Sequence, residues 1–235
     1  RIAKLMEAKD WQQLYAITNL GMLGDAFSHF VHGHFDEEML RGALAHPAPG
    51  AFDAMVKQGL RPHYWDESLL LANVLSGFGE RLVTPLTESF HAKLAFHPAY
   101  EPFYAGKLKQ EHATIVRILV DAPLAAFTDL FLAFFNLRGD FSEIHLSHYK
   151  WLLDVVGKVQ SPLLVEPLID LLRFEKHILG GDAAFMKKIF KAIGQLGSKA
   201  DAAVLAHHFD AAAETRPDVA DAYHAAVARL AKKKA

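Results

Sequence analysis

The stretch "FSHFVHGHFDEE", residues 27–38, places three histidines beside a short acidic run. On a helix, His29 and His32 share a face because they lie three residues apart, and their imidazoles could hold one metal ion. His34 and one of the following glutamates could complete the ligand set. The alternative is an ordinary helix face that packs through the phenylalanines between the histidines.

Further groups of possible ligands follow, namely Glu143, His145 and His148, and then His207, His208 and Asp210. Two such groups, brought together by the fold, would make a dinuclear centre. However, the chain has 14 histidines among 235 residues, so short-spaced pairs also arise by chance. We therefore expect no cofactor, and His29, His32 and His34 are the best candidates if a metal binds.

The sequence contains no motif for nucleophilic catalysis or for phosphate binding. There is no cysteine, no Gly-x-Ser-x-Gly nucleophile elbow and no glycine-rich phosphate-binding sequence. Acidic residues are plentiful, but on helices they usually form solvated faces or caps. These residue types favour a non-catalytic protein, with an enzyme on the same fold as the alternative.

Composition narrows the class of protein further. At 235 residues, with 51% hydrophobic and 22% charged residues, the chain can bury a sizeable core. A formal charge of -2 gives no global attraction to nucleic acid or an anionic membrane. The longest apolar stretch, 122–137, is too short for a bilayer and contains Asp129, so we expect no membrane span. The lack of cysteine fits a reducing compartment, and we expect a cytoplasmic location.

Apolar residues recur at three- and four-residue spacings through most of the chain, which predicts an all-α fold. In "HYKWLLDVVGKV" this spacing runs through Leu152, Val155 and Val159. Most proline and glycine lies between such segments. The expected helices are residues 10–20, 25–45 with a break near Gly33, 50–60, 66–79, 85–96, 107–120, 123–137, 143–158, 162–174, 182–196, 199–211 and 217–232.

Proline marks a regular interval along the chain. Pro85, Pro123 and Pro162 fall 38 and 39 residues apart, each at the expected start of an apolar helix, and steps of 38 lead to Pro47 and Ala200. Proline suits the first position of a helix, where its missing N–H has no intrahelical acceptor. Thr84 and Ser161 are the expected N-caps of two of these helices. The interval predicts a unit of two antiparallel helices.

A repeat of this length, made of helix pairs, resembles the HEAT-like repeats of α-solenoids. The resemblance is clearest over residues 65–211 and weaker over 1–64, with a capping helix and basic tail at 217–235. It implies one domain over residues 1–235, a right-handed α-α superhelix of about five or six helix pairs. An irregular multi-helix bundle is the alternative fold.

Two enzyme families are built on the HEAT-like solenoid that this chain resembles. The deoxyhypusine hydroxylases bind iron through His-Glu pairs, and no His-Glu dipeptide occurs in this chain. DNA glycosylases of the DNA-alkylation-repeat type use a basic concave face to follow phosphates. Here the second helices of the repeats carry Glu88, Asp129, Glu166 and Asp170, which argues against nucleic acid as a partner.

The remaining interpretation is a protein-protein interaction scaffold. A stack of helix pairs leaves one row of helices exposed, where a peptide or a partner helix can dock. The acidic residues in this row indicate a partner with basic residues. The candidate contact residues are Thr87, Glu88, His91, Thr128, Asp129, Glu166, Asp170, Arg173 and His207.

Overall fold

The computed structural model of the chain describes residues 2–16, 19–32, 36–60, 65–94, 112–136, 143–178 and 182–233. Within these ranges every regular element is a helix, so the predicted all-α class is confirmed. No helix in the described ranges is long and apolar enough to cross a membrane. The chain divides into two compact units, Arg1–Ala122 and Pro123–Ala235.

The N-terminal unit is built from short helices that alternate between two groups. Its elements are α1 (Ile2–Glu7), α2 (Trp11–Tyr15), α3 (Leu20–His32), α4 (Glu37–Leu44), α5 (Ala51–Gly59), α6 (Trp65–Ser76), the 3-10 turn η1 (Gly79–Leu82), α7 (Val83–Leu94) and the helical residues 112–121. Helix α5 packs against both α3 and α7, while α4 packs against α6. Contacts therefore link alternate helices, as well as consecutive ones such as α3 and α4.

A buried histidine ties three segments of the N-terminal unit together. His46 lies in the turn after α4, and its Nε2 is 3.2 Å from the carbonyl oxygen of Leu14 on α2. Its Nδ1 accepts a hydrogen bond of 3.1 Å from the N–H of Ala48. With Nδ1 accepting, Nε2 carries the proton and donates to Leu14, so the ring is the neutral tautomer. The turn before α5 is thereby fixed to α2.

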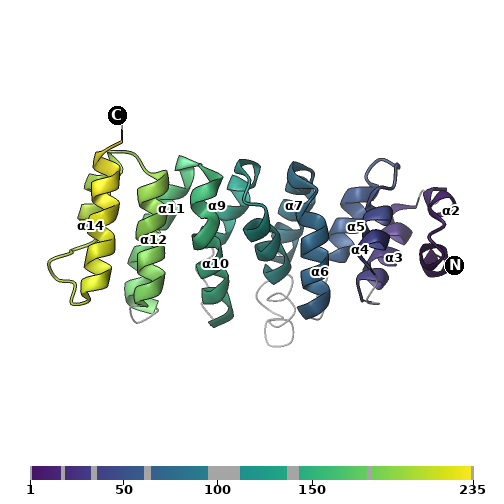
Figure 1. The fold of residues 1–235 in the computed structure, drawn as a ribbon, viewed down its shortest axis with the longest axis horizontal. Coiled ribbons are helices and arrows are strands. Elements are labelled where there is room, and N and C mark those ends of the chain that lie inside the picture. Colours follow the sequence, from purple (N-terminus) through teal and green to yellow (C-terminus); the bar gives the residue numbers. More distant parts are fainter. Residues whose placement is uncertain are drawn as a thin grey trace. The chain divides into compact units, whose positions relative to one another are not determined.

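The C-terminal unit shows the same alternation more clearly. Its elements are η2 (Ala125–Phe127), α9 (Thr128–Asn136), α10 (Glu143–Val159), η3 (Pro162–Leu164), α11 (Val165–Ile178), α12 (Ala183–Leu196), α13 (Asp201–His208) and α14 (Pro217–Ala231). Helix α12 packs against both α10 and α14, and α11 packs against both α9 and α13. Figure 1 shows α12 and α14 side by side in the nearer layer of this unit. The unit thus has an α10-α12-α14 layer and an α9-α11-α13 layer.

Aromatic side chains fill the space between these layers. Phe190 of α12 meets Phe209 and Tyr223 with ring centroids 4.8 and 5.8 Å away. Phe209 follows α13 and Tyr223 lies on α14, so the three rings join both layers. Edge-to-face contacts of this kind stabilise a core beyond the area that they bury. Gly194 lets α14 approach closely, because a Cβ there would lie 3.2 Å from Cα of Ala226.

Most predicted helices match the structure within a few residues. The expected break near Gly33 falls at residues 33–35, outside the described ranges, between α3, which is described to His32, and α4, which begins at Glu37. The expected N-cap at Asp10 is also confirmed, because its side chain accepts from the N–H of Gln13. Helix α1 was not predicted. The expected helical residues 107–111 lie outside the described ranges.

The turns at the prolines differ in detail from the prediction. A 3-10 turn comes immediately before each of α7, α9 and α11. Thr84 therefore lies inside α7 rather than at its N-cap. Ser161 does precede η3, but its side chain makes no capping hydrogen bond. The predicted N-cap at Thr84 was wrong, because the chain turns through a 3-10 segment before α7 begins, whereas Ser161 is the N-cap residue of η3 without a side-chain bond.

The alternation of layers inside each unit is what a stack of helix pairs would give. The HEAT-like resemblance, the superhelix and the single domain over residues 1–235 stay predictions.

Candidate docking surface

The predicted contact residues fall into two groups, one in each unit. Thr87, Glu88 and His91 lie on α7 of the N-terminal unit. The others lie on the α9-α11-α13 layer of the C-terminal unit, namely Thr128, Asp129, Glu166, Asp170, Arg173 and His207. That these helices are the second helices of a repeat stays a prediction.

The group on α7 is largely occupied by contacts within the unit. The carboxylate of Glu88 forms an ion pair with Lys57 on α5. Thr87 is half-buried, whereas His91 is exposed beside Phe90, with ring centroids 5.6 Å apart. Since Glu88 already holds a cation of the same unit, its charge is less available to a partner than the sequence indicated.

The C-terminal group has its acidic side chains at the start of two adjacent helices. Asp129 lies in the first turn of α9 and Glu166 in the first turn of α11, and both are exposed. Neither forms an ion pair with another described residue. A carboxylate in the first turn also favours the positive end of the helix dipole, which is a local structural role. The two acids nevertheless leave negative charge on this layer.

The other members of this group have mixed environments. The hydroxyl of Thr128 donates a 2.7 Å hydrogen bond to the carbonyl oxygen of Ala125, so it closes the turn that begins α9. Asp170 is half-buried. The ring of His207 is exposed and lies 4.9 Å from that of His208. The side chain of Arg173 lies outside the described residues.

Two exposed apolar side chains on this layer were missed by the sequence reasoning. Leu163, in η3, is 66% exposed, and Val204, on α13, is 43% exposed. Leu163 is three residues before Glu166, where η3 leads into α11, and both side chains are exposed. An apolar residue after proline at a helix start resembles a core position, so its exposure could not be predicted from the sequence.

The α10-α12-α14 layer is different, because many of its charges are paired between helices. The Nζ of Lys150, on α10, forms an ion pair with the carboxylate of Asp182 at 2.5 Å. The Nζ of Lys187, on α12, forms one with the carboxylate of Asp218, on α14, at 2.6 Å. The hydrogen bond from Lys187 lowers the pKa of Asp218 below its ordinary value. Lys188 and Asp154 form a third pair between α12 and α10. These pairs link the helices of this layer, whereas Asp129 and Glu166 on the α9-α11-α13 layer have no ion-pair partner among the described residues.

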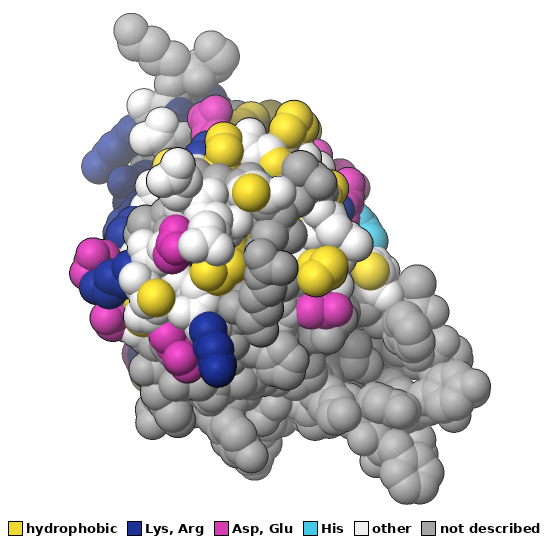
Figure 2. All heavy atoms as spheres, turned by 90° about the vertical axis from the view of Figure 1, so that its right-hand side faces the viewer, with side chains coloured by type: hydrophobic (Ala, Val, Ile, Leu, Met, Phe, Trp, Pro, Cys, Tyr) yellow, Lys and Arg dark blue, Asp and Glu magenta, His cyan; other side chains and the backbone are white. Residues whose placement is uncertain are grey.

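The exposed apolar residues of the N-terminal unit do not form a comparable surface. Leu20 and Met22, both on α3, are exposed. Figure 2 views the end where the chain begins and shows its hydrophobic side chains separated by polar and acidic ones. No continuous apolar patch is visible on the described part of that face.

The candidate metal ligands are not placed by the structure. His29 and His32 belong to α3, but their side chains lie outside the described residues, as does His34 altogether. The same holds for the side chains of Glu143 and His145, whereas His148 is buried. Elsewhere, no group of three histidine, aspartate or glutamate side chains in the described ranges is arranged to hold a metal ion.

Comparisons with family models, with curated proteins and with solved structures found no match to this chain.

Proposed function

We propose that the protein is a non-catalytic interaction module that docks a basic, partly apolar peptide or helix on the α9-α11-α13 layer. The observation that carries the proposal is the pairing of charge and apolar surface at the start of α11. There Glu166 is exposed and has no ion-pair partner among the described residues, and Leu163, three residues earlier in η3, is 66% exposed.

The neighbouring helices extend this surface in both directions. Helix α9 adds Asp129, and helix α13 adds the apolar Val204 and the ring of His207. A partner helix with lysines and leucines on one face would pair its cations with the two carboxylates. Its leucines would cover Leu163 and Val204. Each exposed ion pair contributes only about 0.2–1 kcal/mol, so several must act together with apolar burial.

We further propose that the helices form HEAT-like repeats, because such an architecture would present a row of exposed helices to a partner. A cytoplasmic location is part of the same proposal, because a chain of this length without cysteine suits a reducing compartment.

A direct test uses a fluorescein-labelled amphipathic peptide of lysine and leucine, followed by fluorescence anisotropy. Wild-type protein should bind it more weakly as salt rises, because exposed ion pairs are screened. Glu166→Lys should weaken binding about fivefold to tenfold, since it replaces attraction with repulsion at the centre of the surface. Leu163→Ser should weaken binding about threefold to tenfold without changing charge.

The matched control is Asp221→Lys, which makes the same charge change at an exposed position of α14. It should leave the affinity within twofold of wild type. Equal losses for Glu166→Lys and Asp221→Lys would show that the peptide senses only net charge, and the proposal would then be wrong.

A further inference from the structure

A polar pocket opens at the end of the C-terminal unit where α10, α12 and α14 finish. Its volume is about 330 Å³, and its lining residues are Gly157, Gln160, Gln195, Leu196 and Arg229. Gly157 and Gln160 come from the end of α10, Gln195 and Leu196 from the end of α12, and Arg229 from the last turn of α14. None of these residues belongs to the docking surface proposed above.

Two backbone features keep this pocket open. Gly157 has no side chain, and a Cβ at this position would overlap the side-chain oxygen of Gln195. The carboxamide of Gln195 can therefore extend over α10. Gln160 has a φ of 57°, a left-handed conformation that is unusual for a residue other than glycine. A glutamine held in this conformation is strained, and it ends α10 at the rim of the pocket.

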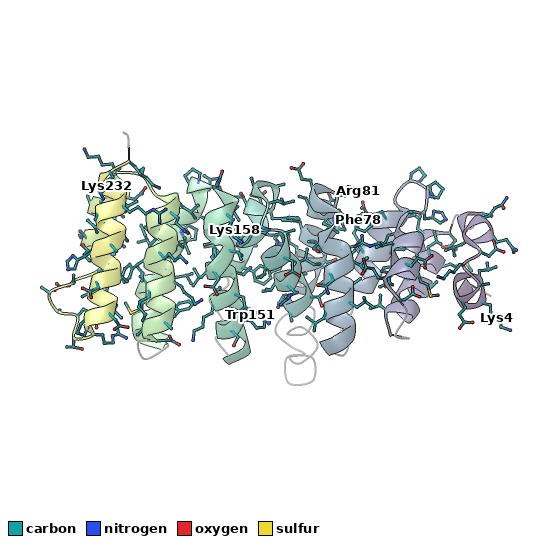
Figure 3. The ribbon with its side chains drawn as sticks, viewed as in Figure 1. Lys4, Phe78, Arg81, Trp151, Lys158 and Lys232 are labelled. Carbon is teal, nitrogen blue, oxygen red and sulfur yellow. The ribbon has the colours of Figure 1, made fainter. Side chains whose placement is uncertain are left out.

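The charge around the pocket is positive. Arg229 is exposed and forms no ion pair with a described residue, and no acidic side chain lines the pocket. Lys158 lies in the last turn of α10, and Lys232 follows α14. Figure 3 labels both lysines and shows Trp151 nearer the opposite end of α10.

These cations could have a purely structural role at the ends of the helices. The last carbonyls of a helix carry partial negative charge, which nearby cations offset. At α12 this role belongs to another residue, Lys233, whose Nζ donates to the carbonyl oxygens of Gln195 and Gly197 at 2.6 and 2.5 Å. Arg229 is therefore not needed to satisfy the end of α12, although in the last turn of α14 it also offsets the dipole of its own helix.

The charges of neighbouring side chains also affect the pKa of Lys233. Burial lowers the pKa of Lys233, the positive charge of Arg229 lowers it further, and Asp201 opposes them. Asp201 is itself engaged, because it accepts hydrogen bonds from the N–H and the hydroxyl of Ser198 at 2.6 and 2.8 Å. The charges at this end of the unit are therefore net positive, which favours the binding of an anion.

We propose that this pocket binds a carboxylate group of an acidic peptide. The guanidinium of Arg229 can donate two parallel hydrogen bonds to a carboxylate, a geometry that lysine cannot reproduce. The carboxamides of Gln160 and Gln195 supply further N–H donors at the pocket wall. Lys158 and Lys232 attract neighbouring acidic residues of the same peptide over a longer range. The volume lies at the small end of ligand pockets, which suits one side-chain or terminal carboxylate.

The test is fluorescence anisotropy of the full chain with a fluorescein-labelled hexaglutamate peptide at low and moderate salt. Arg229→Gln should weaken binding about threefold to fivefold, and Arg229→Lys should fall between Arg229→Gln and wild type. The matched control is Lys4→Gln, which removes one positive charge from an exposed position on α1 in the other unit. This control should bind within twofold of wild type.

Gly157→Ala tests the pocket without changing charge. Its Cβ should displace the Gln195 carboxamide and weaken peptide binding about threefold, while circular dichroism shows an intact fold. Unlabelled glutarate should compete with the peptide better than inorganic phosphate does. Wild-type affinity in Arg229→Gln, an equal loss in Lys4→Gln, or equal competition by phosphate would each overturn the carboxylate site. Glu166→Lys should not reduce this binding, so the outcome separates this inference from the proposed function.

Discussion

The Lys150 ammonium lies 2.5 Å from the Asp182 carboxylate and so joins α10 to the start of α12. Asp182 is also the N-cap of α12, where its other oxygen accepts a 3.0 Å hydrogen bond from the N–H of Phe185. Although burial raises the pKa of Asp182, the hydrogen bonds from Lys150 and Phe185 lower it below its ordinary value. One side chain therefore serves as both a helix cap and an interhelical ion pair.

We predict that Asp182→Ala destabilises the protein by about 1.5–2 kcal/mol, because it removes both the cap and the pair. Asp182→Asn should cost only about 0.5–1 kcal/mol, since asparagine keeps the cap and loses the charge. Urea unfolding followed by circular dichroism measures both values. Equal losses in the two variants would contradict the double role.

Acid should weaken the C-terminal unit through the contact between Glu214 and Arg216. The carboxylate of Glu214 accepts from Nε of Arg216 at 2.8 Å and from its second guanidinium nitrogen at 2.9 Å. The hydrogen bond from Arg216 is the main reason that the pKa of Glu214 falls from 4.5 to about 2, against the opposing effect of burial. Because the folded-state pKa is lower, this contact stabilises the protein above pH 4.5 and is lost as the pH falls toward 2.

Glu214→Gln should therefore lower stability by about 1–2 kcal/mol at neutral pH, a value reduced because so local a pair also forms in the unfolded chain. The difference from wild type should shrink as the pH falls from 4.5 toward 2. The measurement is the free energy of unfolding in urea across this pH range. A constant difference between the two proteins would show that the glutamate charge is not responsible.

The helices were predictable because their signal is local. The apolar spacing through Leu152, Val155 and Val159 places all three side chains in the core, and α10 runs from Glu143 to Val159 as expected to within one residue. The same spacing placed α12 correctly at residues 183–196, against the expected 182–196. Helical periodicity thus gave the fold class without any knowledge of contacts.

The candidate site was less predictable, because charge pairing depends on neighbours that are distant in sequence. Glu88 looks free on its own helix, yet Lys57 reaches it from α5. Thr128 looks like a surface hydroxyl, yet it closes the turn before α9. The polar pocket was missed entirely, since Gly157, Gln195 and Arg229 meet only when three helices end together.

His46 should stabilise the N-terminal unit through its two hydrogen bonds to the backbone. His46→Leu would leave the buried carbonyl oxygen of Leu14 and the N–H of Ala48 without these partners, at a cost of about 2–3 kcal/mol. His91→Leu is the matched control, because that imidazole is exposed on α7 of the same unit, and it should change stability by less than about 0.5 kcal/mol. Thermal and urea unfolding measure both. Similar losses would contradict a specific role for the His46 bonds.

Two helical glycines should respond in opposite ways to alanine, because their neighbours differ in how far they can move. At Gly59 a Cβ would lie 2.7 Å from Cε1 of Phe27, whose ring is fully buried, so Gly59→Ala should cost about 1–3 kcal/mol. At Gly157 the neighbour is the end of the flexible Gln195 side chain, which can swing away. Alanine favours the helix by up to about 1 kcal/mol over glycine, so Gly157→Ala should be neutral or stabilising. Urea unfolding of the two variants decides the matter, and a destabilised Gly157→Ala would show that the Gln195 carboxamide is held rigidly in place.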